Sequence, residues 1–427
     1  MTRELGMMTW RGRPIAPICC YLLSLTILTL SVVAPAFAAG LERGPVFSID
    51  KKGEKFEGDG RPSIAVLANG DIIFVWDVVR DGQSFVAARR FSSEGIPQGG
   101  EFRVNRLASG DAGGADVAAL SDGGFVVVWG ASAKAPSRSQ LFAQRFSANG
   151  ERLGPQHGVA WPSFEEYQGL ARVVGLAGGG YTIYWRSSFH VNEDNLRLFG
   201  QRFSSSGEKI GAKFRLTLTP PLSYDAVVLK NGNRVAIWCS QAGGDATVVS
   251  GRIFSATDVP LGSEFQVSTT AGKYCSAPHI ASLADGSFVV VWMTYDSLFR
   301  YVAYGRKFAA DGIAISSEFI DAASENDYAG PTVAAASGGD FVIISGARGG
   351  AQLYSSSAAK IGSKIKIATS FFEHTTVAVS GLLDNRFIAS WEKDVRPGEH
   401  EISARFISIS EELTSRAAGR VIGTSSK

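Results

Sequence analysis

The sequence predicts an all-β protein, a seven-bladed β-propeller of four-stranded antiparallel blades. A short turn between apolar runs recurs seven times, at steps of 53, 56, 53, 54, 53 and 46 residues, and such a period indicates a repeat array. Each turn is followed by a largely apolar run without helical spacing, such as Phe125–Trp129, which is typical of a buried strand. The last repeat also lacks a strand that the amino-terminal part of the chain can supply.

The seven turns consist of residue pairs that tolerate a positive φ at both positions. Such pairs predict two-residue hairpin turns of type I′. The pairs are Asn69-Gly70, Asp122-Gly123, Gly178-Gly179, Asn231-Gly232, Asp285-Gly286, Gly338-Gly339 and Asp384-Asn385.

Each repeat contains four strand signals. A short strand such as 63–67 precedes the turn, and the apolar run follows it. A third strand carries motifs such as Ala143-Gln-Arg-Phe146, and a fourth follows a glycine-bearing turn, as in Phe214-Arg-Leu216. Repeated four-stranded units favour a propeller over a sandwich, because a sandwich needs non-repeating strands to close its edges.

The seventh repeat has only its first three strands, and nothing after it matches the fourth. The match lies at the other end of the chain, where Gly44–Ile49 repeats the spacing of Gly211–Leu216. We therefore expect the amino-terminal strand to close the last blade and to remove an exposed sheet edge. The sixth repeat has Ser345 where the others have tryptophan, so the regularity of that blade is left open.

The pattern Leu-x-Asp-Gly-Gly-Phe-Val-Val-x-Trp, seen in Leu120–Trp129, is followed by Ala-Gln-Arg-Phe in 143–146. This combination resembles the repeats of about fifty residues in bacterial secreted and surface proteins, a β-propeller-like repeat family. The resemblance covers nearly all of the chain after residue 38. It is specific for the repeat and implies no particular reaction.

Residues 1–38 are expected to form a Sec-type signal peptide. Arg3, Arg11 and Arg13 precede an apolar core at 21–33, and Ala36-Phe-Ala38 is a small-x-small cleavage motif. The core is short for a membrane span, so we expect a secreted, periplasmic or cell-surface protein without an integral membrane segment in the mature chain. Residues 39–410 should form the propeller, and 411–427 a flexible tail.

The charge of the mature chain excludes one class of partner. Without residues 1–38, 39 basic and 39 acidic residues remain, and no basic stripe indicates nucleic-acid binding. The five histidines lack the close helical spacing of a zinc site. We expect no metal, no cofactor and a monomer.

Two cysteines remain after the signal segment, Cys239 and Cys275. In a propeller, the segment that leaves a second strand and the segment that enters the next blade share one rim, so the two thiols can meet. In an exported protein this pair predicts a disulfide, with two separate buried thiols as the alternative.

Aromatic residues beside charged groups recur in the loops between blades. Tyr167, Tyr274 and Tyr328 lie 12, 12 and 11 residues before the second residue of the next turn, so they should occupy equivalent positions around the central mouth. With Glu165 and His374 they are the candidate ligand-binding residues, with the tyrosines as stacking platforms. The alternative is that each tyrosine only covers the end of an inner strand.

The resulting prediction is an exported binding or interaction module for a carbohydrate or protein ligand on the long-loop face, with no catalytic residue assigned. The first alternative is a secreted polysaccharide hydrolase or lyase, with an acidic pair and a histidine in the loops. Its candidate residues are Glu165, Glu193, Asp194, Glu373, His190 and His374. The second alternative is a structural component of the envelope or surface.

Overall fold

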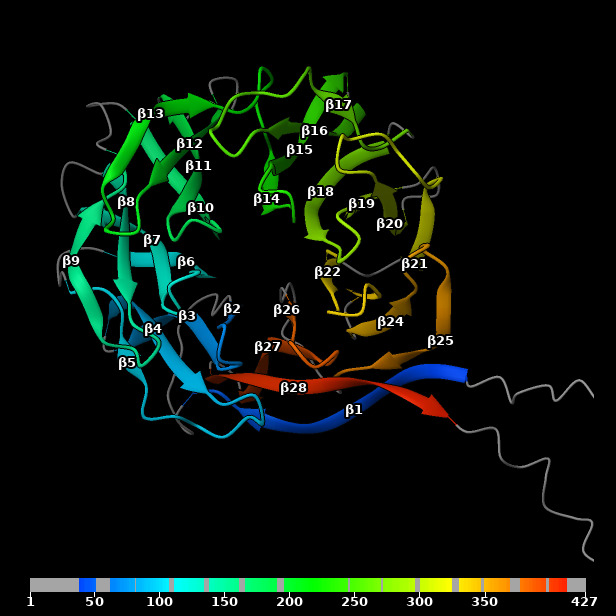
Figure 1. Ribbon diagram of the computed structural model, residues 1–427, viewed down its shortest axis with the longest axis horizontal. Helices are drawn as coiled ribbons and strands as arrows, with labels where there is room; N and C mark the ends of the chain where they lie inside the picture. Colours follow the sequence, from blue (N-terminus) through cyan, green and yellow to red (C-terminus); the bar gives the residue numbers. More distant parts are fainter. Residues whose placement is uncertain are drawn as a thin grey trace, which may run out of the picture. The chain divides into compact units, whose positions relative to one another are not determined.

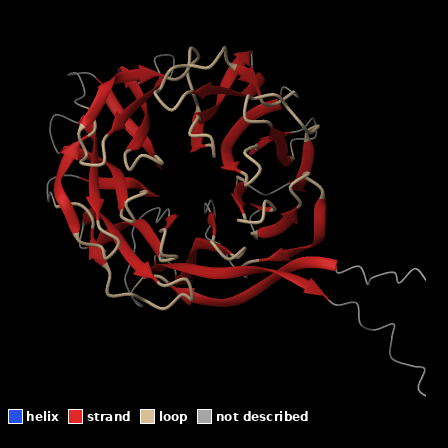
Figure 2. Ribbon diagram, in the orientation of Figure 1, coloured by secondary structure: helices blue, strands red, loops and turns tan. Residues whose placement is uncertain are grey.

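The protein forms a seven-bladed β-propeller, confirming the predicted fold (Figure 1). The computed structural model describes residues 38–50, 62–80, 82–106, 111–133, 138–160, 166–189, 196–244, 246–269, 272–295, 300–324, 330–346, 349–368, 377–396 and 399–412. Within these residues, Figure 2 shows strands and loops and no helix. The inner strand of each blade contacts that of the next, and the first inner strand contacts the seventh, so the ring is closed.

The blades follow one another along the chain. Blades one to six have their strands in sequence order from the centre outward, and blade seven has β1 as its outermost strand. Blades one to four consist of β2 (Ser63–Val66), β3 (Ile72–Arg80), β4 (Gln83–Phe91), β5 (Phe102–Arg103); β6 (Asp111–Ala119), β7 (Phe125–Ala133), β8 (Arg138–Phe146), β9 (Arg152–Gly158); β10 (Glu166–Gly175), β11 (Tyr181–Phe189), β12 (Arg197–Phe203), β13 (Lys209–Arg215); and β14 (Ser223–Val228), β15 (Arg234–Gly243), β16 (Ala246–Phe254), β17 (Phe265–Gln266). Blades five to seven consist of β18 (Gly272–Ser282), β19 (Phe288–Tyr295), β20 (Tyr301–Phe308), β21 (Phe319–Ser324); β22 (Thr332–Ala335), β23 (Phe341–Ser345), β24 (Gly350–Tyr354), β25 (Lys360–Lys366); and β26 (Ala378–Gly381), β27 (Phe387–Arg396), β28 (Glu399–Glu412) with β1 (Ala38–Ser48).

The amino-terminal strand closes the last blade, as predicted. β1 pairs antiparallel with β28, the third strand of blade seven. Its Leu41 is buried in a cluster that includes Ile367 of blade six. Its Phe47 stacks on Phe406 with ring centroids 5.6 Å apart and lies at the same distance from Phe91 of blade one. The closing strand therefore joins blades six, seven and one.

Asp50 follows this strand and gives the fold a testable pH dependence. Its carboxylate accepts hydrogen bonds from Ser48 Oγ at 2.8 Å and from the Ile402 backbone N–H at 3.3 Å. Burial raises the pKa of Asp50 to about 6. The folded protein thus binds this proton more tightly than the unfolded chain, and stability should fall by about 3 kcal/mol as pH rises from about 4 to above 6.

We expect Asp50→Asn to remove that part of the pH dependence and to stabilise the protein at pH 7. Urea unfolding of both proteins between pH 4 and 8 measures the difference. Other titrating groups affect both proteins equally, so only the difference between the two curves reports on Asp50. Curves that run parallel over this range would show that the ionised carboxylate carries no penalty.

The hairpin turns differ from the predicted type I′. Only the second residue of each pair has a positive φ, for example 86° at Gly70 and 63° at Asn385. In the first turn, Gly70 N–H donates to Leu67 O, and Leu67 N–H donates to Asp71 O. This is a turn followed by a left-handed bulge residue. Asn69 Oδ1 accepts the Asp71 N–H at 3.0 Å, which explains the Asn or Asp at the first position.

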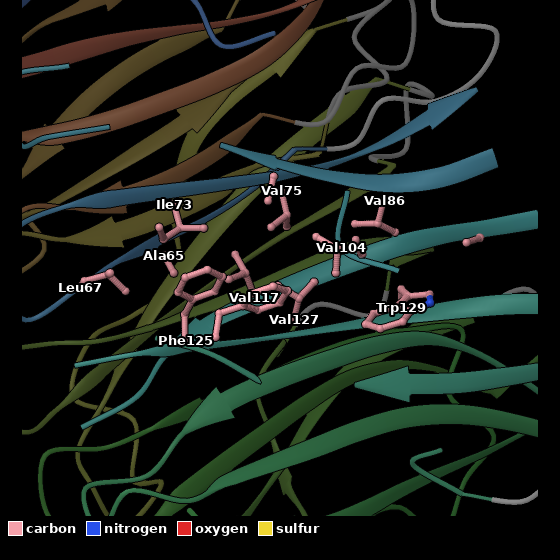
Figure 3. Packing of buried hydrophobic residues seen from close by; sticks show 14 residues of the cluster. Ala65, Leu67, Ile73, Val75, Val86, Val104, Val117, Phe125, Val127 and Trp129 are labelled. Carbon is pink, nitrogen blue, oxygen red and sulfur yellow. The ribbon is translucent and has the colours of Figure 1, made fainter. Parts of the chain in front are cut away.

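The core consists of apolar layers between adjacent blades. Figure 3 shows one such layer, in which Val75 and Val86 of blade one meet Val127 and Trp129 of blade two. Six of the second strands contain a tryptophan that is at most 2% exposed: Trp76, Trp129, Trp185, Trp238, Trp292 and Trp391. They contribute to stability by packing, as their position in the repeat predicts.

Blade six has all four strands, β22 to β25, although it lacks the tryptophan. Ser345 Oγ donates to the buried carboxylate of Asp321 in blade five. Tyr354 Oη and Lys364 Nζ donate to the same carboxylate at 2.7 and 2.8 Å. A satisfied polar cluster therefore replaces the indole between blades five and six.

Blades four and five are joined covalently. Cys239 of β15 and Cys275 of β18 form the predicted disulfide, with Cα atoms 5.8 Å apart. The first residues of β18 also pair with β16, which merges the two blades into one sheet. A disulfide is typical of proteins that fold in oxidising compartments. Of the residues described, none belongs to a helix long and apolar enough to cross a membrane.

Candidate functional site

A cavity of about 330 Å³ lies inside the ring, at the end where β2, β22 and β26 begin. Figure 1 shows the inner strands surrounding this centre. All seven blades contribute to the cavity wall through their inner strands or the residues next to them. A cavity of this size lies in the range of small-ligand sites.

One position of the repeat supplies the polar groups of this wall. It lies seven residues before the second residue of each turn, for instance Asp116 before Gly123. In six consecutive blades the residue at this position is polar or charged. In blade order the seven residues are Ser63, Asp116, Arg172, Asp225, His279, Thr332 and Ala378, and all of them line the cavity.

Irregular backbone precedes three of the four ionisable residues. The ladders of β6, β10 and β18 each shift register just before Asp116, Arg172 and His279. Bulges of this kind redirect the side chain that follows them and are common beside functional sites. Two positions before each of these three side chains, the backbone is left-handed. The left-handed residues are Gly114 (φ 66°), Leu170 (φ 49°) and Ala277 (φ 45°).

Two of these left-handed residues have a Cβ atom, which costs about 1–2 kcal/mol at each position. Tyr224 helps to hold the backbone at Leu170, because its hydroxyl donates to the carbonyl oxygen of Leu170. Burial raises the pKa of Tyr224, so this hydroxyl keeps its proton at neutral pH. Gly330 leaves space for the side chain of Ala277, since a Cβ atom on Gly330 would lie 2.3 Å from Ala277 Cβ. Neighbouring blades thus support the strained backbone that aims Arg172 and His279.

Asp116 bridges three blades. Ser63 Oγ of blade one donates to Asp116 Oδ1 at 2.8 Å, and the Val173 N–H of blade three donates to Oδ2 at 2.8 Å. Burial raises the pKa of Asp116, and the positive charge of Arg172 only partly opposes this shift. Of the two aspartates in the cavity, Asp116 is therefore the one that binds a proton more readily.

The pKa of Asp225 is shifted in the opposite direction to that of Asp116. Burial alone would raise the pKa of Asp225, but His279 and Arg172 outweigh burial and lower it. His279 Nδ1 lies 3.4 Å from Oδ2, and Arg172 Nε lies 3.8 Å from Oδ1. The N–H groups of Ala226 and Ile280 also donate to this carboxylate, at 2.9 and 3.1 Å. Asp225 is thus held as a carboxylate.

Arg172 carries the positive charge between these two aspartates. Burial would lower the pKa of Arg172, but Asp116 and Asp225 raise it. The side chain remains 38% exposed, and that of His279 remains 32% exposed, so both can contact a molecule in the cavity. The wall therefore offers carboxylates in blades two and four, and an arginine and a histidine in blades three and five, an arrangement suited to a ligand that is rich in hydroxyl or other polar groups.

The structure describes only two of the ligand-binding residues that the sequence predicted, Tyr167 and Tyr274. Tyr167 lies on β10, opposite Ser188 of β11. Tyr274 lies on β18, is 70% exposed and has a φ of 71°. Glu165, Tyr328 and His374 lie outside the described residues, as do the hydrolase or lyase candidates His190, Glu193, Asp194 and Glu373. The proposed tyrosine ring therefore stays a prediction.

Sequence reasoning missed Asp116, Arg172 and Asp225 and assigned no role to His279. The signal was present in the repeat itself. When the seven repeats are aligned on their turns, the seventh residue before each second turn residue is apolar only in the last one, Ala378. A polar residue in the middle of an inner strand of a buried core needs a partner or a cavity.

Metal ligation has no support among the residues described. No three histidine, cysteine or carboxylate side chains in those parts of the chain lie together in a way that could hold a metal ion.

Comparisons with known proteins extend the fold assignment. No protein-family model and no curated protein matches the sequence. Among solved structures, an α-L-arabinanase from Penicillium chrysogenum, complexed with arabinobiose, aligns with a TM-score of 0.52 at 10% identity over 86% of this chain and 98% of its own. The polysaccharide lyase Uly1 aligns with a TM-score of 0.54 at 9% identity, over 87% and 99% of the two chains. A protein of unknown function from Dyadobacter fermentans aligns with a TM-score of 0.50 at 12% identity, over 87% and 100%. At such identities the likeness establishes a shared propeller fold.

Proposed function

We propose that this protein is a carbohydrate-binding propeller and that the central cavity holds a sugar unit of its ligand. The observation that carries this proposal is the single repeat position that places polar residues of six consecutive blades around one cavity. Three of these side chains follow bulges with left-handed backbone. Two of the left-handed residues, Leu170 and Ala277, are not glycine, and strained positions of this kind cluster at functional sites.

The chemistry of the wall suits a sugar. Hydroxyl groups both donate and accept hydrogen bonds, and the cavity presents the Arg172 guanidinium as a donor and the carboxylates of Asp116 and Asp225 as acceptors. The volume of about 330 Å³ fits one small ligand unit. The arabinanase and the polysaccharide lyase that share the fold are both named for carbohydrate substrates, which adds support from analogy only.

An exported protein fits this proposal, because polysaccharides are encountered mainly outside the cytoplasm. The Cys239–Cys275 disulfide is consistent with an oxidising compartment. The signal segment predicted at residues 1–38 would deliver the chain there.

Hydrolysis of the bound carbohydrate is the second candidate function. One observation favours it: the pKa of Asp116 is raised and that of Asp225 is lowered within the same cavity. Environments that push two pKa values apart define an acid and a base. Asp116 would protonate the glycosidic oxygen of the leaving sugar as the bond to the anomeric carbon breaks. Asp225 would take a proton from the water that attacks this carbon.

The test is a glycan and polysaccharide array probed with the mature chain and with three variants. We expect Arg172→Met to lower the affinity for the bound glycan about 100-fold, because a charged hydrogen-bond donor is lost and two carboxylates are left without their cation. Asp116→Asn and Asp225→Asn should each weaken binding less. Asp311→Asn, which changes an exposed turn carboxylate of blade five, is the matched control and should bind normally.

The same proteins separate binding from hydrolysis. If the protein is a hydrolase, new reducing ends will appear with the wild type, and Asp116→Asn will abolish them while much of the binding remains. If reducing ends never appear, the protein is a binding module. Glycan binding that Arg172→Met leaves unchanged would place the ligand elsewhere and contradict the proposal.

A further inference from the structure

We propose a second sugar subsite on blade five, in which Tyr274 stacks on one ring of a polysaccharide while another unit, a few sugar units further along the same polymer, occupies the central cavity. This inference rests on the proposed function. It concerns a different part of the molecule, because Tyr274 does not line the cavity.

The exposure of Tyr274 is the first observation. At 70% exposure it is the only aromatic side chain among the described residues that is more than about a third exposed. No other exposed large apolar side chain belongs to the described parts of β18, β19 or β20. A single aromatic ring on a polar surface suits a ligand that has a small apolar face and many hydroxyl groups, as a sugar ring has.

The backbone of Tyr274 is the second observation. Its φ of 71° lies in the left-handed region, which residues with a Cβ atom avoid. The next residue, Cys275, is joined to Cys239, and its N–H donates to Thr247 Oγ1 of blade four. A covalent bond and a buried hydrogen bond thus hold the strand where it presents this ring.

The support behind the ring is the third observation. The ring of Tyr274 meets that of Tyr295 at a centroid distance of 5.8 Å and an angle of 67°. Tyr295 in turn packs on Tyr301 at 4.2 Å, and their hydroxyl groups are hydrogen-bonded. Such contacts restrict the motion of an exposed side chain, which reduces the entropy lost when a ligand binds.

The position along β18 connects this subsite with the cavity. His279, which lines the cavity, lies five positions after Tyr274 on the same strand. A chain of five residues spans at most roughly 17 Å, so an oligosaccharide of a few units can reach both places. Tyr274 is therefore expected to contribute to the binding of long ligands and not to that of short ones.

The experiment compares polymers with their own disaccharides: arabinan with arabinobiose, xylan with xylobiose, and alginate with its disaccharide. Affinities are measured for the wild type, Tyr274→Gly, Tyr274→Trp and Arg172→Met. Glycine removes the ring and adopts a positive φ without strain, so Tyr274→Gly should unfold at the same temperature as the wild type or higher. Leu383→Ala is the control, because this exposed side chain lies beside the hairpin turn of blade seven and lines a separate cavity.

We expect Tyr274→Gly to lower the affinity for the bound polymer about tenfold and to leave that for the disaccharide within about twofold. Tyr274→Trp and Leu383→Ala should bind both as the wild type does. If Tyr274→Gly binds the polymer normally while Arg172→Met does not, the second subsite is wrong and the proposed function stands. If the wild type binds none of the polymers or disaccharides, the proposed function fails, and the subsite fails with it.

Discussion

A chain that begins at residue 51 is expected to lose cooperative folding, whereas a chain that begins at Ala38 should fold normally. The truncation removes β1 and leaves β28 as an exposed edge strand. It also removes Leu41, Phe47 and Ile49 from the cores that join blade seven to blades six and one. Burying three such side chains stabilises a protein by roughly 5–8 kcal/mol, which is comparable to the whole stability of a typical domain.

Thermal unfolding and sedimentation of the two chains measure this effect. A synthetic peptide of residues 38–50, added to the truncated chain, should restore cooperative unfolding, because it can pair with β28 as β1 does. The same peptide with Leu41→Asp and Phe47→Asp keeps the backbone hydrogen bonds but cannot pack, so it should fail. A truncated chain with the unfolding temperature of the longer one would show that the ring does not need its closing strand.

Replacing both Cys239 and Cys275 by alanine should destabilise the protein by about 4 kcal/mol, because the disulfide closes a loop of 36 residues. In a propeller of this size, that loss lowers the unfolding temperature by about 5 °C. The two sulfur atoms lie in the core between blades four and five, so the effect includes some lost packing.

Reduction provides the control for this prediction. A reductant should lower the unfolding temperature of the wild type by nearly as much as the double substitution does, and it should have no effect on the double variant. Equal stability of the oxidised wild type and the double variant would show that the disulfide contributes nothing to the folded state. Because Tyr274 adjoins Cys275, the double variant should also bind long ligands less tightly if the second subsite exists.

Much of this fold could be predicted because each blade repeats the same local signals. A turn whose second residue tolerates a positive φ and a buried apolar run mark each unit independently of its neighbours, and a tryptophan follows in every unit except the sixth. The closing strand could be found because Gly44–Ile49 retains the spacing of an outer strand. Blade six shows the limit of this method. Ser345 appeared as a defect in the repeat, and only the contact with Asp321 and Lys364 shows what replaces the indole.

The prediction of type I′ turns was wrong for a physical reason. Gly and Asn tolerate positive φ wherever they occur, so the pair Asn69-Gly70 is compatible with several turns. The number of residues between the paired strands decides among them. That number depends on the register of the ladder, and the first turn position takes an ordinary backbone conformation.

The features of the protein can be separated into those that the sequence predicted and those that only the tertiary structure revealed. Periodicity predicted the seven blades and the shared last blade, because these features depend on the order and spacing of residues. The pairing of Cys239 with Cys275 was predicted from the shared rim of adjacent blades and from export, with two separate thiols as the alternative, and the structure decided for the disulfide. The tertiary structure decided which polar residues face one another. Asp116, Arg172, Asp225 and His279 lie more than fifty residues apart in succession, and bulges in β6, β10 and β18 aim three of them into the cavity. Closing the ring is what brings them together, since no local interaction along the chain joins one blade's inner strand to the next.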